Sequence, residues 1–106
     1  MAVQVNTSGS TIASATTEVA LATIASAGVY QLAADFSVLT STGFAEVRIY
    51  GKAQSGDTER QIWCNTVSGQ DTDKLAVSPA LLSPHHFKAT VKATETKTIT
   101  WAIYQA

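Results

Sequence analysis

The chain has 106 residues, a formal net charge of −1 and charged side chains at only 14% of its positions. A chain of this length forms one domain with a single core and leaves little room for a deep cleft. The near-neutral charge, with lysines and arginines scattered singly, creates no field that would attract a polyanion, so we expect no nucleic acid partner.

Cysteine content and the N-terminal sequence restrict the class of protein further. Cys64 is the only cysteine, which excludes an intrachain disulfide and a zinc site made of several thiolates. The first residues lack the basic start and apolar block of a signal peptide, and no apolar run approaches the roughly 20 residues that span a bilayer. We therefore expect no membrane partner.

Residues 1–17 differ in composition from the rest of the chain. They are rich in Ser, Thr, Ala and Gly and contain no charged side chain. Because such a segment buries too little apolar surface to fold alone, we expect an N-terminal arm, flexible or extended, followed by one domain at residues 18–106. The arm is either a frayed terminus or an extended segment that adds to a neighbour's sheet edge through main-chain hydrogen bonds. In the second case its contact residues are Val3, Val5 and Ile12.

Two runs in the centre of the chain alternate as the strands of a half-buried sheet do. In residues 28–36, four apolar side chains share one face, which we assign to the core: Tyr30, Leu32, Ala34 and Phe36. Residues 45–52 alternate more cleanly, and their apolar face holds Ala45, Val47, Ile49 and Gly51. The opposite face of that strand is polar, and we predict that Arg48 and Tyr50 on it contact a partner.

Shorter runs fill the rest of the chain. The same alternation occurs in residues 18–26, 58–67, 87–93 and 98–105. Between the runs 58–67 and 87–93, Pro79 and Pro84 confine Leu81-Leu82 to an edge strand or irregular coil. Trp63 lies either in a second core layer or on an exposed contact surface. About six or seven short strands with regular turn signals predict an all-β domain, a single antiparallel β-sandwich or jelly roll.

Three features could carry chemistry, and each has a simpler structural interpretation. His85-His86 could bind a metal or sense pH, but adjacent strand residues point to opposite faces, so we interpret them as turn or surface histidines. Asp71 and Asp73 match a fragment of a calcium loop that lacks its glycine and its final glutamate. Cys64 is interpreted as a small buried hydrophobic residue. Since the sequence also lacks a nucleophile elbow and a phosphate loop, we expect no catalytic, metal or cofactor site.

Two stretches of the chain carry a pattern of ordered, spaced residues. The first runs Gly28-Val29-Tyr30-Gln31-Leu32, then Asp35, Leu39 and Gly43, then Glu46-Val47-Arg48-Ile49-Tyr50 with Lys52, Gly56 and Thr58. The second is Phe87-Lys88-Ala89-Thr90-Val91-Lys92-Ala93-Thr94, a polar turn, and a last strand with Trp101. Over residues 19–106 this order and spacing resemble a recurrent pattern in small virion structural proteins of tailed bacteriophages.

The resemblance implies a non-enzymatic particle component with no catalytic residues and no cofactor. It implies capsid decoration that stabilises the head, with the major capsid protein or other virion proteins as partners. The implied location is the virion, after synthesis in the host cytoplasm, and a homo-oligomer is expected. Two alternatives remain: a tail or fibre component, and a carbohydrate- or receptor-binding β-sandwich that uses exposed aromatic side chains.

Overall fold

Nine β-strands and their connections make up residues 4–106, the part of the chain that the computed structural model describes. This range contains no helix, which confirms the predicted all-β class. The strands are β1 (Gln4–Ala13), β2 (Glu18–Ile24), β3 (Gly28–Asp35), β4 (Phe44–Gly51), β5 (Arg60–Ser68), β6 (Leu75–Val77), β7 (Leu81–Ser83), β8 (Phe87–Ala93) and β9 (Lys97–Gln105).

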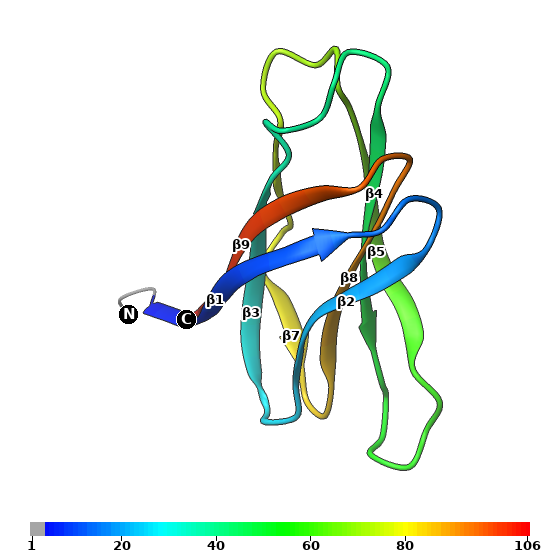
Figure 1. Ribbon diagram of the computed structural model, residues 1–106. Helices are drawn as coiled ribbons and strands as arrows, with labels where there is room; N and C mark the ends of the chain where they lie inside the picture. Colours follow the sequence, from blue (N-terminus) through cyan, green and yellow to red (C-terminus); the bar gives the residue numbers. More distant parts are fainter. Residues whose placement is uncertain (1–3) are drawn as a thin grey trace.

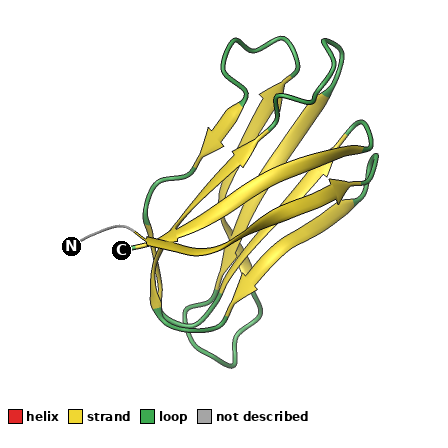
Figure 2. Cartoon of the chain, turned by 60° about the vertical axis from the view of Figure 1, so that its left-hand side comes forward, coloured by secondary structure: helices red, strands yellow, loops and turns green. Residues whose placement is uncertain are grey.

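The strands form two antiparallel sheets that pack face to face (Figure 1, Figure 2). Sheet A has the order β1-β9-β3-β6, with β7 also paired to β3, and sheet B has the order β2-β8-β4-β5. The ladders β1·β9, β2·β8, β3·β6 and β4·β5 compose one long antiparallel ribbon whose tip is the β4–β5 hairpin. A ribbon folded over in this way into two sheets is a jelly roll, so the predicted sandwich or jelly roll is confirmed.

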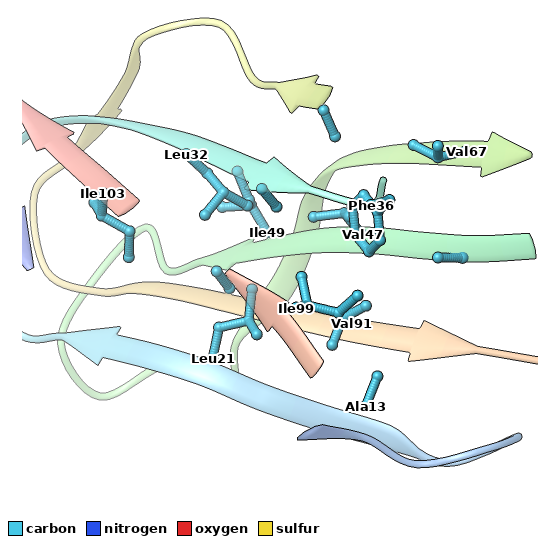
Figure 3. Close-up of a cluster of buried hydrophobic side chains, with 14 of the residues drawn as sticks. Ala13, Leu21, Leu32, Phe36, Val47, Ile49, Val67, Val91, Ile99 and Ile103 are labelled. Carbon is cyan, nitrogen blue, oxygen red and sulfur yellow. The ribbon is translucent and has the colours of Figure 1, made fainter. Parts of the chain in front are cut away.

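The core lies between the sheets, where side chains from both point toward one another (Figure 3). The four residues of 28–36 assigned to it, three on β3 and Phe36 directly after it, are all buried, as are Val47 and Ile49 of β4, which confirms the predicted alternation. The Tyr30 ring packs against Phe87 with centroids 5.4 Å apart, and its hydroxyl donates to the backbone oxygen of Ser26 at 2.8 Å. This largest buried polar side chain is therefore satisfied inside the core.

The N-terminal segment differs from the expected arm outside the domain. Residues Gln4–Ala13 form β1, which pairs with β9 over its whole length, so blue β1 and orange-red β9 lie side by side in Figure 1. The segment is extended, but it is an edge strand of the molecule's own sheet. Its sequence shows no burial pattern because only Ala13 is buried, while the strand is held by backbone bonds to the distant end of the chain. Val3 lies outside the described residues.

β5 corrects the interpretation of Cys64 as a buried residue. Cys64 is exposed because it lies opposite Arg48, on the outer side of the β4–β5 ladder. Trp63 next to it lies opposite Ile49 and packs, half-buried, against the core. Of the two positions that the sequence allowed for Trp63, the structure therefore shows the one against the core.

β6 and β7 are two halves of an interrupted edge strand beside β3. Ser78 is buried in the gap, where its hydroxyl accepts from the backbone N–H of Leu32 and donates to the oxygen of Pro79, both at 2.9 Å. The interruption occurs at Pro79, which has no N–H to donate to a ladder. Of the edge strand and the irregular coil that the sequence allowed for Leu81-Leu82, the structure shows the edge strand.

Candidate interaction surfaces

The outer face of sheet A, which we term the uncharged face, spans all five strands of that sheet. The ladder registers place on it Val5, Ser8, Ser10 and Ile12 of β1, Thr98, Thr100, Ala102 and Tyr104 of β9, Val29, Gln31, Ala33 and Asp35 of β3, Leu75 and Val77 of β6, and Leu82 of β7. Asp35 is the only charged residue among them, and its carboxylate accepts from the backbone N–H of Ser37 at 2.8 Å. A broad sheet surface therefore holds one charge, at a strand end.

Apolar side chains are exposed at both margins of the uncharged face. The exposed fractions are 57% for Val5 and 62% for Ile12 at the β1 margin, and 57% for Leu75, 49% for Val77 and 75% for Leu82 at the opposite margin. Covering such side chains is favourable, and no paired charge has to lose its water. The uncharged face is therefore suited to contact with another protein surface.

The outer face of sheet B, which we term the charged face, has the opposite character. Its charged residues are Glu18, Glu46, Arg48, Glu59, Lys88 and Lys92. One oxygen of Glu18 lies 3.2 Å from Nη1 of Arg48, which also bonds Glu46 through its Nε. The other oxygen of Glu18 accepts from the hydroxyls of Tyr50 at 2.6 Å and Thr90 at 2.5 Å. Glu18 thus joins side chains of three strands.

A second cluster on the charged face is centred on Glu59. Its two oxygens lie 2.7 Å from Nε2 of His86 and 3.1 Å from Nζ of Lys88. The bond from His86 is the largest of the causes that lower the pKa of Glu59. Because Lys88 also lies 5.8 Å from the ring centre of Tyr50, the two clusters are continuous.

Hydrogen bonds also hold the pKa of the other two carboxyls on this face below the ordinary value. For Glu18 the largest cause is the bond from Thr90, and for Glu46 it is the bond from Arg48. These carboxylates are ionised at neutral pH and already bonded within the face. A partner would have to break these bonds before it could use the charges.

The predicted contact residues fall into separate places. Val5 and Ile12 lie exposed on the uncharged face. Arg48 and Tyr50 lie on the charged face within the Glu18 cluster. Trp63 faces the core. Of the predicted contact residues, only Val5 and Ile12 therefore belong to one open apolar surface.

Sequence reasoning missed Leu75, Val77 and Leu82, which complete the far margin of the uncharged face. Their strands have three residues each, too short for an alternation to be recognised. The signal that could have found them is the position of exposed apolar residues on both sides of Pro79, at a sheet edge.

Two of the residues that could have carried chemistry, Asp71 and His86, have hydrogen-bond partners within the fold. The Asp71 carboxylate accepts from the backbone N–H of Ser68 at 2.9 Å and so stabilises a turn. Partial desolvation, and after it the neighbouring Glu46 carboxylate, raises the pKa of the exposed Cys64 thiol, the opposite of what activates a nucleophile. Across residues 4–106, no three His, Cys, Asp or Glu side chains lie close enough to hold a metal ion. Nor does this range contain a helix long and apolar enough to cross a membrane.

A hollow of about 350 Å³ lies at one end of the sandwich. Its walls include Lys52, Arg60, Leu82, Ser83 and His86. The buried hydroxyl of Ser83 has no partner among the described residues, and it shares no hydrogen bond with the imidazole of His86. The imidazole of His86 is bonded to Glu59 instead, so Ser83 has no base bonded to it in this hollow.

These features define a class of protein: a small jelly-roll domain whose most distinctive surface is an uncharged sheet face. Comparison with known proteins adds no relative, because no protein-family model and no curated protein matches the chain. The functional evidence therefore lies in the fold and in the two outer faces.

Proposed function

We propose that this chain is a non-enzymatic structural protein that docks on a larger particle through the uncharged face. The observation that supports this proposal is a five-stranded surface with Asp35 as its single charged residue and exposed apolar side chains at both margins. Docking such a face removes apolar surface from water without desolvating paired charges. The charged face, bonded within itself, then remains toward solvent and favours solubility.

The particle that we propose is the head of a tailed bacteriophage, with the major capsid protein as partner. The support for this narrower proposal is the resemblance of residues 19–106 to small virion structural proteins. A flat face contact of one small domain is weak, but contacts repeated over a shell add by avidity. The jelly roll agrees with this role because it occurs in viral capsid domains, although it also occurs in lectins and does not decide between them.

The two alternatives differ in how the structure supports them. A tail or fibre component would use the same uncharged face on a different partner. A carbohydrate-binding module has less support, because Trp63 is half-buried against the core and the Tyr50 hydroxyl is bonded to Glu18. Neither aromatic ring is an open platform for a sugar.

Co-sedimentation with purified capsids that lack decoration protein tests the proposal. We expect the natural chain to bind and Val77→Lys to bind at least about tenfold more weakly, because docking would bury an unpaired charge. Thr66→Lys, at an exposed position of the charged face, is the matched control and should bind like the natural chain.

Three outcomes would contradict parts of the proposal. Equal binding of both lysine variants would exclude the uncharged face. Binding to isolated tails but not to heads would transfer the function to the tail. Saturable binding to a glycan array, without binding to any particle, would favour the carbohydrate-binding alternative.

A further inference from the structure

The sandwich has several sheet edges, and most of them carry devices that oppose pairing with another strand. β6 and β7 are short and are separated by Pro79. β2 begins with Glu18 and its register with β8 shifts between Ala20 and Ala22. β5 begins with Arg60, contains a register shift, and lies beside the ion pairs of β4. Short strands, proline, charge and bulges are the means by which proteins protect sheet edges.

β1 is the exception among these edges. It is the longest strand of the sandwich and contains neither a charged residue nor a proline. It pairs only with β9, and no other backbone or side-chain hydrogen bond within residues 4–106 reaches its main chain. A row of N–H and C=O groups along one side of β1 is therefore open to another strand.

One bulge limits where this edge is regular. The register with β9 shifts between Val5 and Thr7, and the Asn6 amide in the bulge donates to the side-chain oxygen of Gln105 at 2.8 Å. From Thr7 to Ala13 the register with β9 is continuous. The open edge is therefore regular from Thr7 to Ala13.

The first five residues of this regular segment read the same in both directions. Thr7-Ser8-Gly9-Ser10-Thr11 is symmetric about Gly9. In an antiparallel pair of two copies centred on Gly9, each side chain would meet its own kind, with Ser8 opposite Ser10 and Thr7 opposite Thr11. Hydroxyl pairs of this kind stabilise antiparallel strands, and no like charges meet across the axis.

We propose that two copies of this chain associate through their β1 edges, antiparallel and centred on Gly9. A two-fold axis perpendicular to the sheet makes the contact self-complementary and closes it at a dimer. The two A sheets become one continuous sheet, and both uncharged faces lie on the same side of it. Each dimer would then present a doubled docking face, which increases avidity on a repetitive surface.

The packing of Gly9 is compatible with this register. A side chain at this position would approach the Trp101 ring to 3.2 Å on the core side, so the position is occupied by the smallest residue. The Trp101 Nε1 donates to the Thr11 hydroxyl at 3.0 Å, which fixes the strand beside the proposed axis. Ser8 and Ser10 point to the other side and are exposed, so they can be changed without disturbing the core.

Analytical ultracentrifugation of the purified chain over a dilution series tests the proposal. The natural chain should dimerise. Ser8→Lys with Ser10→Lys places two lysines opposite each other twice in the dimer and should weaken dimerisation at least about tenfold. Ser8→Glu with Ser10→Lys places opposite charges in the same contacts and should dimerise within about threefold of the natural chain or more tightly. Ser8→Thr with Ser10→Thr is the uncharged control and should leave the dimer intact.

Comparing the Lys–Lys and Glu–Lys variants also distinguishes this register from other modes of association. A monomer at every concentration, or a dimer that the two lysines do not weaken, would overturn the proposal. Equal weakening in the Glu–Lys variant would overturn the Gly9-centred register. Growth beyond the dimer would also overturn the proposal, because it requires head-to-tail pairing, such as β1 with β5, which does not close. Circular dichroism confirms folding of each variant, and because no particle is present, the result is independent of the proposed docking function.

Discussion

The two outer faces of this jelly roll are built from strands of one ribbon, yet one carries many charged side chains and the other almost none. The charged face gathers Glu18, Glu46 and Arg48 and bonds them to one another. The uncharged face has Asp35 as its single charged residue and exposes apolar side chains at its margins. A face that satisfies its own polar groups gains little from a partner, whereas a face with exposed apolar surface gains from being covered.

The same contrast applies to what stabilises the two sheets. Sheet A depends on packing of its inner side chains and on buried hydrogen bonds such as those of Ser78. Sheet B adds a layer of side-chain bonds on its solvent side, centred on Glu18 and Glu59. Substitutions in the two sheets should therefore differ in size and in pH dependence.

The largest effect is expected at Trp101, which supports the β1 edge of sheet A. Its half-buried ring packs on the core and lies against Gly9, so Trp101→Ala should lower the free energy of unfolding by about 3 kcal/mol. Urea denaturation measures the loss, and hydrogen exchange should show protection lost first in β1. Trp101→Phe, which removes the bond to Thr11 but keeps a ring, should cost about 1 kcal/mol. Equal protection of β1 in Trp101→Ala would contradict this role.

A smaller loss is expected at Ser78, in the interrupted edge strand of the same sheet. Ser78→Ala leaves the buried N–H of Leu32 without its acceptor and should cost about 2 kcal/mol in urea denaturation. Ser83→Ala is a closely matched control, because Ser83 is equally buried but its hydroxyl has no partner within residues 4–106. That control should be neutral or slightly stabilising. If both variants lose the same stability, the hydrogen bonds of Ser78 do not hold the edge.

Much of the fold could be predicted because the central strands have local patterns. Tyr30, Leu32 and Ala34 alternate with outward residues on β3, and Val47 and Ile49 do so on β4, so a period of two identifies their buried faces. Such a pattern is visible wherever a strand has one face in the core and one in solvent.

The N-terminal strand and the far margin of the uncharged face could not be predicted, for different reasons. Gln4–Ala13 has small polar residues on both sides, and its partner β9 lies at the other end of the chain. The alternation in β5 predicts that Cys64 faces the core, but the register of the β4–β5 ladder shifts next to Ile49 and turns Cys64 outward. Leu75 and Leu82 become neighbours of one face only when β3 pairs with both short strands. Non-local pairing and irregular register leave no local signal.

On the charged face, a single substitution should have a moderate effect. Glu18→Ala removes the acceptor of the buried Thr90 hydroxyl and the partner of Arg48, and should cost about 1 kcal/mol in urea denaturation. Glu18→Gln keeps an oxygen acceptor and should recover part of that loss. Raising the salt concentration should reduce the difference between the natural chain and Glu18→Gln, since that difference is mainly charge. A salt-independent difference would mean that the ion pair with Arg48 contributes nothing.

The sharpest test of the contrast between the faces is the response of stability to acid. The pKa values of Glu18, Glu46 and Glu59 lie below the ordinary 4.5, so the folded state binds their protons more weakly than the unfolded state does. Their contribution is complete above about pH 4.5 and is lost as the pH falls through the folded values. Replacing all three by Gln should flatten the acid side of the stability–pH curve.

The matched control places three Gln residues on the uncharged face instead, at Ser8, Ser10 and Thr100. Since it removes no carboxylate, its curve should keep the steep acid side of the natural chain. Urea denaturation at a series of pH values measures both curves. If the two triple variants lose stability in parallel as the pH falls, the acid sensitivity resides elsewhere, and Glu95 becomes the next group to test because hydrogen bonds from Thr40 lower its pKa too.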